Sequence, residues 1–221
     1  MAVLGVAGIG MTSVLASPLA GQDLQDRVPV LLVPGWFETA EDLAGFRVRL
    51  RSAGWPAEAM AAVTFQDPTG GNGPHAREIA RAVTLLRERT GAPRVDIVAH
   101  SMGGLATRLY LKEEPGAVRR VVFLATPHRG TLSAYLAFGE GREEMLPGSP
   151  FLTALNDGPP VPEGVEAMTV RTIIDTHIVP GESATLPGVP DHVLCCVTHE
   201  GLTRDLAAFQ VVRDFLLKEG A

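Results

Sequence analysis

The residues Ala-His-Ser-Met-Gly-Gly place Ser101 between an apolar run and a helical pattern. Residues 93–98 predict a short strand, and residues 105–114 predict a helix. A nucleophilic serine on such a sharp turn requires small residues two positions away, because larger side chains would collide with the strand or the helix. Ala99 and Gly103 fill these positions. The spacing therefore predicts that Ser101 is a nucleophile on a strand-to-helix elbow.

A serine hydroxyl becomes a good nucleophile only when a base, usually a histidine oriented by a carboxylate, accepts its proton. His199 follows the last predicted strand, where a loop can return over Ser101. Asp175 ends an apolar run between Ser101 and His199. The chain order Ser, Asp, His is typical of enzymes whose serine lies on a nucleophile elbow. We predict a Ser101, Asp175, His199 triad, with Asp157 and Asp191 as alternative acids.

Two backbone N–H groups must stabilise the oxyanion that such a reaction forms. Met102 directly follows the predicted nucleophile, and Trp36 lies in the loop after the first predicted strand, so we predict these two amides as the donors. Phe37 and His128 also follow predicted strands and are expected to line the substrate pocket. His100, beside the nucleophile on a tight turn, is interpreted as structural support.

A cluster of His192, Cys195, Cys196 and His199 suggests metal ligands at first sight. On a strand, however, odd and even positions face opposite sides, so the four side chains cannot converge, and we predict no metal site. Adjacent cysteines are poorly placed for a disulfide, and buried free thiols are expected. The chain also has no glycine-rich phosphate loop of the P-loop or dinucleotide-binding type.

The elements that would position these residues alternate along the chain. Amphipathic helices are predicted at residues 41–53, 76–90, 105–114 and 206–217, and a loop at residues 68–74. Alternating apolar strands and helices predict an α/β fold with a mainly parallel sheet and helices on both faces. In such a sheet, functional groups lie at the carboxyl ends of the strands. The six strands are predicted at residues 28–33, 60–65, 93–98, 118–125, 168–174 and 192–197.

The 221 residues are sufficient for one domain, predicted over residues 21–221. A hydrophobic content of 46% predicts a globular protein, and the net charge of −6 gives no basic surface for nucleic acid. Residues 130–165 interrupt the alternation and predict a lid or pocket wall. Residues 1–20 fit either an incomplete signal peptide or an apolar arm, so export is expected, with a cytoplasmic location as the alternative.

The motifs resemble those of bacterial lipases and esterases of the α/β-hydrolase superfamily, particularly small lipases of the Bacillus lipase A type and their triacylglycerol-lipase relatives. The elbow at Ser101 is the most specific match, with Ala99 in place of the usual first glycine. Residues 30–35 resemble the oxyanion strand, but Pro34 stands where a histidine is usual. Residues 124–131, 175–180 and 198–202 resemble the segment after the next strand, the acid segment and the histidine loop.

The resemblance implies a compact hydrolase of carboxylic esters that uses no cofactor. Together with the predicted triad, it favours a serine lipase or esterase that acts through an acyl-enzyme on small-molecule or lipid esters, with transient contact at a lipid interface. An acyltransferase or polyester hydrolase with the same triad remains an alternative. A binding protein that kept the fold without catalysis is a further alternative.

Overall fold

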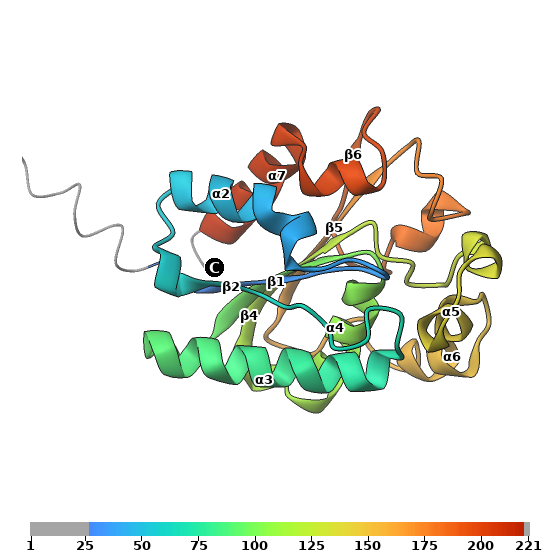
Figure 1. Cartoon of the computed structure of the whole chain (residues 1–221), viewed down its shortest axis with the longest axis horizontal. Helices are drawn as coiled ribbons and strands as arrows, with labels where there is room; N and C mark the ends of the chain where they lie inside the picture. Colours follow the sequence, from blue (N-terminus) through green and yellow to red (C-terminus); the bar gives the residue numbers. More distant parts are fainter. Residues whose placement is uncertain (1–26, 219–221) are drawn as a thin grey trace, which may run out of the picture.

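A computed structural model of the chain describes residues 27–218, and these residues contain one six-stranded sheet (Figure 1). Every neighbouring pair of strands is parallel, in the order β2-β1-β3-β4-β5-β6. The prediction of an α/β fold with a mainly parallel sheet is therefore confirmed. The strands are β1 (Val30–Val33), β2 (Met60–Ala62), β3 (Val95–His100), β4 (Val118–Leu124), β5 (Glu166–Thr172) and β6 (Asp191–Leu194).

Helices cover both faces of this sheet, which explains why its strands are continuous apolar runs. Helices α2 (Ala44–Ser52) and α7 (Leu206–Leu217) lie on one face, and α3 (Asn72–Thr90) and α4 (Met102–Glu113) lie on the other (Figure 1). Shorter elements complete the described chain: 3-10 turns at Ala40–Leu43, Ala57–Ala59, Pro115–Ala117, Leu132–Leu136, Gly181–Ala184 and Glu200–Thr203, and helices α5 (Glu140–Met145) and α6 (Pro150–Leu155).

Each face of the sheet has its own apolar core. On the first face, Phe46 of α2 meets Phe209 of α7 edge-to-face, with ring centroids 5.6 Å apart. On the second face, Ile79 of α3, Ala106 of α4 and Ile97 of β3 belong to one buried apolar cluster. The sheet is thus held firmly from both sides, and its carboxyl-end loops can depart from regular structure without loss of the core.

Several local predictions are wrong. The predicted strand at 60–65 ends at Ala62. The predicted loop at 68–74 is partly helical, because α3 begins at Asn72, whose backbone N–H donates to the Glu144 carboxylate 2.5 Å away. The predicted strand at 192–197 ends at Leu194. Cys195 and Cys196 therefore lie beyond the strand, where they are exposed and joined by a disulfide rather than buried as free thiols.

Residues 130–165 return to the carboxyl edge of the sheet. Their 3-10 turn at Leu132–Leu136 and helices α5 and α6 enclose a small apolar cluster of their own with α4. Residues 1–20, the predicted signal peptide or arm, lie outside the described residues. Within residues 27–218, no helix combines the length and apolar character needed to cross a membrane.

Candidate active site

Ser101 lies on the sharp turn between β3 and α4. Its backbone has φ 51° and ψ −130°, a conformation rare for a residue with a side chain. The strand partner β4 fixes this conformation, because the Ser101 N–H donates to the Leu124 carbonyl at 2.8 Å. Gly103 allows the turn to pack closely, since a β-carbon there would lie 2.1 Å from the Pro34 carbonyl oxygen. The local fold thus holds the Ser101 hydroxyl at the carboxyl edge of the sheet.

The structure brings the three predicted triad residues together. His199 Nε2 lies 3.0 Å from Ser101 Oγ, and His199 Nδ1 lies 2.9 Å from Asp175 Oδ2. The serine and histidine are almost completely buried, at 9% and 5% exposure. Asp175 follows β5, and His199 follows β6, so three separate strand ends contribute one residue each. This arrangement can transfer a proton from the hydroxyl to the imidazole.

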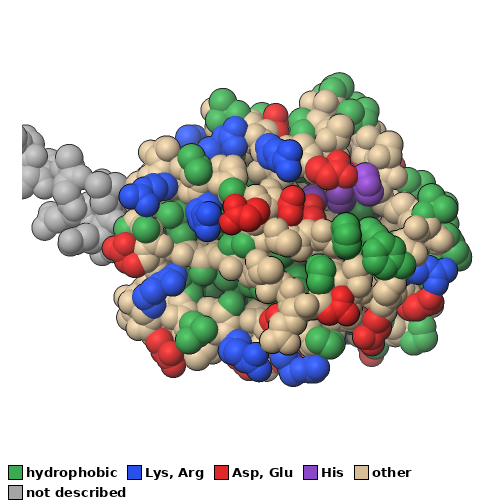
Figure 2. Space-filling view, viewed as in Figure 1, with side chains coloured by type: hydrophobic (Ala, Val, Ile, Leu, Met, Phe, Trp, Pro, Cys, Tyr) green, Lys and Arg blue, Asp and Glu red, His purple; other side chains and the backbone are tan. Residues whose placement is uncertain are grey.

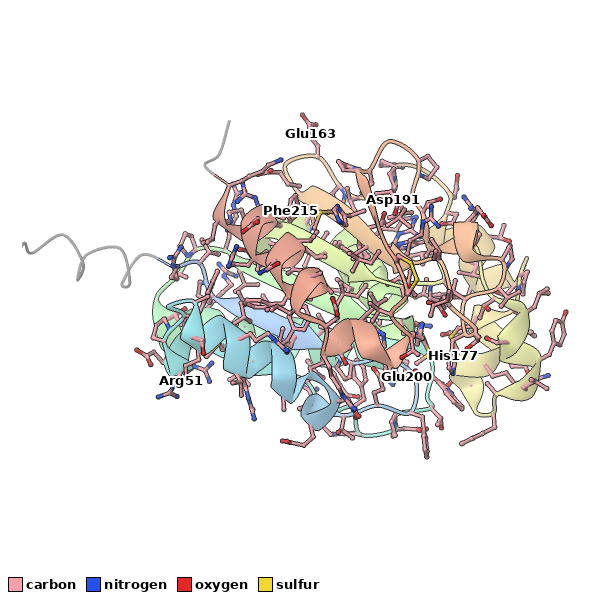
Figure 3. The ribbon with its side chains drawn as sticks, turned by 90° about the horizontal axis from the view of Figure 1, so that it is seen from above. Arg51, Glu163, His177, Asp191, Glu200 and Phe215 are labelled. Atoms are coloured by element: carbon pink, nitrogen blue, oxygen red, sulfur yellow. A yellow bond between two sulfur atoms is a disulfide. The ribbon has the colours of Figure 1, made fainter. Side chains whose placement is uncertain are left out.

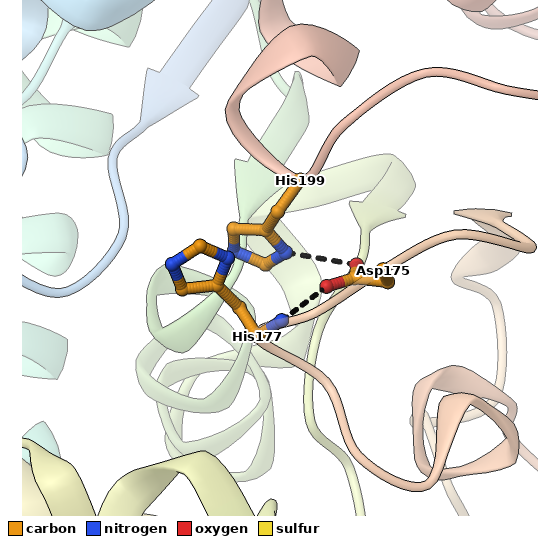
Figure 4. A group of neighbouring side chains, drawn as sticks. All are labelled: Asp175, His177 and His199. Carbon is orange, nitrogen blue, oxygen red and sulfur yellow. Dashed lines mark hydrogen bonds and ion pairs between the residues drawn. The ribbon is translucent and has the colours of Figure 1, made fainter.

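The carboxylate of Asp175 is held by two further donors. Its Oδ1 accepts a hydrogen bond from the backbone N–H of His177 at 2.8 Å (Figure 4) and another from the backbone N–H of Ile178 at 2.9 Å. Burial alone would raise the pKa of Asp175, but the hydrogen bond and charge of His199 and these two N–H groups lower it below the usual value. Asp175 is therefore an ionised acceptor that fixes the Nδ1–H tautomer of His199.

The pKa of His199 is also lowered. Burial is the main cause; the hydrogen bond with Asp175 opposes it, and the nearby charge of His100 adds to it. His199 is therefore neutral at pH 7 and able to accept a proton. The side chain of His177 brings a third possible metal-ligating atom within 4.8 Å of those of Asp175 and His199 (Figure 4), but Asp175 and His199 are already bonded to one another.

The loop after β1 leaves one backbone donor without a partner. Gly35 N–H donates to Glu38 Oε2, Phe37 N–H to the Pro68 carbonyl, and Glu38 N–H to the Gly35 carbonyl. Within residues 27–218, the N–H of Trp36 has no such acceptor, nor has the N–H of Met102 at the start of α4. The two predicted oxyanion donors are thus the amides that the local hydrogen bonding leaves available.

A cavity of about 460 Å³ opens beside the Ser101 hydroxyl. Its wall includes Trp36 and Phe37 from the β1 loop, together with Ala134, Leu136 and Met145 from the 130–165 segment. Residues 130–165 therefore supply one wall of the cavity. A mainly apolar wall with a few polar groups at one end suits a substrate with a hydrocarbon portion and one reactive polar group.

His128 is not among the residues that line this cavity. The chain turns inward after β4, so the His128 ring is completely buried, edge-on to Phe123 with centroids 4.9 Å apart. Burial, assisted by the charges of Arg108 and Arg129, lowers its pKa well below the usual value. The expectation that His128 lines the pocket is therefore corrected: it is a neutral core residue behind the site.

Comparison with known proteins identifies the fold family. A family model described as "alpha/beta hydrolase fold" matches residues 28–158, more than half of the chain. The chain belongs to the α/β-hydrolase fold family. Within that family it is similar to a triacylglycerol lipase of Burkholderia plantarii, with 31% identity over 137 residues that cover 59% of this chain and 38% of the relative.

A second relative of this α/β-hydrolase is a triacylglycerol lipase of Pseudarthrobacter phenanthrenivorans, 32% identical over 48% of the chain and 34% of the relative. The matched regions thus span only about a third of the length of these relatives. Among solved structures, Aspergillus fumigatus lipase B matches with a TM-score of 0.74 and 22% identity, covering 88% of this chain and 53% of that one. Bacillus licheniformis lipase BlEst2 matches with a TM-score of 0.72 and 15% identity, covering 86% and 92%. These two likenesses concern the fold.

Exposed apolar side chains lie on the two segments that line the cavity of this α/β-hydrolase, the loop after β1 and residues 132–138, and Phe37 and Leu136 among them belong to the cavity wall. Figure 2 shows hydrophobic side chains gathered beside exposed histidine on the right of the molecule. Leu136 is the most exposed, at 91%. We call these residues the apolar rim: Phe37, Leu132, Tyr135, Leu136 and Phe138.

Two carboxylate–histidine pairs at the site of this α/β-hydrolase are not predicted from the sequence. Glu38 Oε2 lies 2.8 Å from His100 Nδ1, and Glu200 Oε1 lies 3.3 Å from His177 Nε2. Figure 3 shows His177 and Glu200 as neighbours at the end of the molecule that carries the site. Their residue types suit chemistry, but their spacing, 62 residues for the first pair, gives no local signal.

Proposed function

We propose that this α/β-hydrolase is a serine carboxylic-ester hydrolase, a lipase or esterase, with Ser101, His199 and Asp175 as its catalytic triad. The observation that carries the proposal is the 3.0 Å approach of His199 Nε2 to Ser101 Oγ, with Asp175 on the other ring nitrogen. A neutral imidazole at that distance is a competent general base for a hydroxyl.

In the proposed reaction, Ser101 Oγ attacks the ester carbonyl while His199 accepts the hydroxyl proton. The N–H groups of Trp36 and Met102 donate to the oxyanion of the tetrahedral intermediate. His199 then gives the proton to the leaving alcohol, and an acyl-enzyme remains on Ser101. Water, deprotonated by His199, attacks the acyl group, and the carboxylic acid leaves as Ser101 recovers its proton.

We propose that the substrates are esters with an acyl chain, and that the apolar rim rests on a lipid surface. The mainly apolar cavity wall, the exposed Leu136 at its mouth and the names of the two bacterial relatives support this substrate class. An acyl chain can pass from a lipid surface into the cavity without crossing water, because rim and wall are continuous at Leu136.

The test is turnover of nitrophenyl acetate, butyrate and palmitate by the wild-type protein and Ser101→Ala. We expect hydrolysis by the wild type and its loss in the folded variant, with fluorophosphonate labelling of Ser101 in the wild type alone. Retained turnover in Ser101→Ala contradicts the proposed nucleophile. A wild type that neither turns over esters nor reacts with the fluorophosphonate indicates a non-catalytic binding protein.

Product analysis separates the proposed activity from its enzymatic alternatives. Release of free acid in the presence of an alcohol acceptor supports a hydrolase, whereas a new ester identifies an acyltransferase. Soluble products from polymer films identify a polyester hydrolase. Turnover measured below and above the solubility limit of each ester shows whether a lipid surface favours the reaction.

A further inference from the structure

The ring of His100 lies between two hydrogen-bond acceptors. Its Nδ1 is 2.8 Å from Glu38 Oε2, and its Nε2 is 3.2 Å from the backbone carbonyl oxygen of His199. A carboxylate and a carbonyl accept hydrogen bonds and donate none, so both contacts are made only when both ring nitrogens carry a hydrogen. The ring is completely buried. The geometry thus requires an imidazolium.

The Glu38 carboxylate provides the counter-charge. Its Oε2 also accepts the Gly35 N–H at 2.6 Å. Burial alone would raise the pKa of Glu38, but the charge and hydrogen bond of His100 and the Gly35 N–H lower it to about 2. Burial alone would lower the pKa of His100, but the charge and hydrogen bond of Glu38 raise it above the usual value.

We propose that Glu38 and His100 form a permanent carboxylate–imidazolium pair that joins the oxyanion loop to the histidine loop and keeps the catalytic histidine neutral. Glu38 holds the oxyanion loop through Gly35, and His100 holds the backbone of the histidine loop through the His199 carbonyl. Both are positioning residues rather than catalytic ones. This role rests on the proposed ester hydrolysis, although the charge state of His100 does not.

The pair also acts on His199 through its charge. The His100 and His199 rings lie with centroids 4.7 Å apart, and Glu38 lies on the far side of His100. The positive end of the pair therefore faces His199 and disfavours a second positive charge on it. The other groups that face His199 are Asp175 on Nδ1, the Ser101 hydroxyl on Nε2, and the His177 ring at 4.8 Å, itself paired with Glu200.

His100→Gln tests this effect, because glutamine keeps a neutral N–H donor and removes the charge. We expect the acid limb of the kcat/KM pH profile to move to higher pH by about one unit, since the nearby Glu38 carboxylate then favours protonated His199. In Glu38→Gln, loss of the carboxylate leaves His100 neutral, and we expect a smaller shift in the same direction. An unchanged acid limb, or a shift to lower pH, in either variant would overturn the proposal.

Asp96→Asn is the matched control. Asp96 is completely buried on β3, the strand that ends at His100, and its carboxylate binds the Arg119 guanidinium at 2.9 and 2.5 Å. It lies four residues before His100, near the opposite edge of the sheet. We expect this variant to lose folding stability without moving the pH profile. If the pH profile moves as far in Asp96→Asn as in the Glu38 and His100 variants, the shift is an effect of general destabilisation, and the proposal is overturned.

A second measurement needs neither activity nor a stable variant. Long-range ¹H–¹⁵N spectra of the wild-type protein report the protonation of each histidine ring nitrogen. We expect both His100 nitrogens to be protonated at pH 7, where an unperturbed histidine is mostly neutral. A neutral His100 in this spectrum refutes the pair even if the enzyme hydrolyses esters. Conversely, an inactive wild type with a doubly protonated His100 refutes the proposed function and leaves the pair intact.

Discussion

Gly103 on the nucleophile turn packs directly against Pro34 in the oxyanion loop. A β-carbon added to Gly103 would lie 2.1 Å from the Pro34 carbonyl oxygen, and that backbone oxygen cannot move aside as a flexible side chain could. The turn that carries the nucleophile and the loop that carries Trp36 are thus in van der Waals contact through their backbones. Their relative position is set by the absence of a side chain at one residue.

This contact predicts that Gly103→Ala is strongly destabilising. Overpacking a buried site typically costs about 1–3 kcal/mol, and here the backbone must separate as well, so we expect a loss of about 2 kcal/mol in the free energy of unfolding. Thermal denaturation measures the loss as a fall of several degrees in Tm. Gly116→Ala is the control, because a β-carbon there meets nothing within 4 Å. Equal stability of the two variants would contradict the close packing.

Replacing Asp175 by asparagine tests which carboxylate orients the histidine. Asparagine cannot hold the Nδ1–H tautomer of His199, so we expect kcat to fall by about 10⁴-fold while the fold is kept. The comparison variant is Asp191→Asn, since Asp191 is one of the two alternative acids but binds Thr169 and Arg171 near the opposite edge of the sheet. A large loss in Asp191→Asn with an active Asp175→Asn would reverse the assignment.

The pH profile of the wild-type enzyme is expected to extend to mildly acidic conditions. His199 must be neutral to accept the Ser101 proton, and its pKa is lowered from the ordinary histidine value of 6.5, chiefly by burial. The reaction is therefore lost as pH falls through this lowered pKa, and we expect half of the maximal kcat/KM at a pH below 6.5. A half-maximum above pH 6.5, measured with a neutral soluble ester, would contradict a lowered pKa of His199.

The apolar rim predicts a specific effect on lipid binding. Leu136 is 91% exposed at the mouth of the cavity, and its insertion into a lipid surface would bury most of that side chain. Leu136→Asp is expected to weaken binding to phospholipid or triacylglycerol emulsions by about tenfold or more, measured by flotation with Ser101→Ala as the background.

Leu85→Asp provides the control for that measurement. Leu85 is also exposed, at 60%, but it lies on α3 and is not among the residues that line the cavity. Substitution there is expected to leave emulsion binding unchanged. An equal loss in both variants would indicate a general effect of added negative charge and not a lipid-binding rim.

Local sequence determined the alternation of strands and helices, and with it the parallel sheet. Helix α7 runs from Leu206 to Leu217 as predicted, because its apolar period is uninterrupted and Asp205 caps its first turn. The sequence also predicts that Ser101, Asp175 and His199 follow strands. Because parallel strands bring their carboxyl ends to one edge of the sheet, residues after those strands lie near one another. Periodicity and turn chemistry act over a few residues, and a single sequence records them directly.

Only the tertiary structure decided which side chains meet across long stretches of chain. Glu38 and His100 are 62 residues apart, and no local pattern marks Glu38 as the partner of that imidazole. His128 follows a strand end as a pocket residue would, yet the chain turns its ring into the core against Phe123. The direction of a side chain after a strand depends on the packing of neighbouring loops, and that packing exists only once the whole sheet has formed.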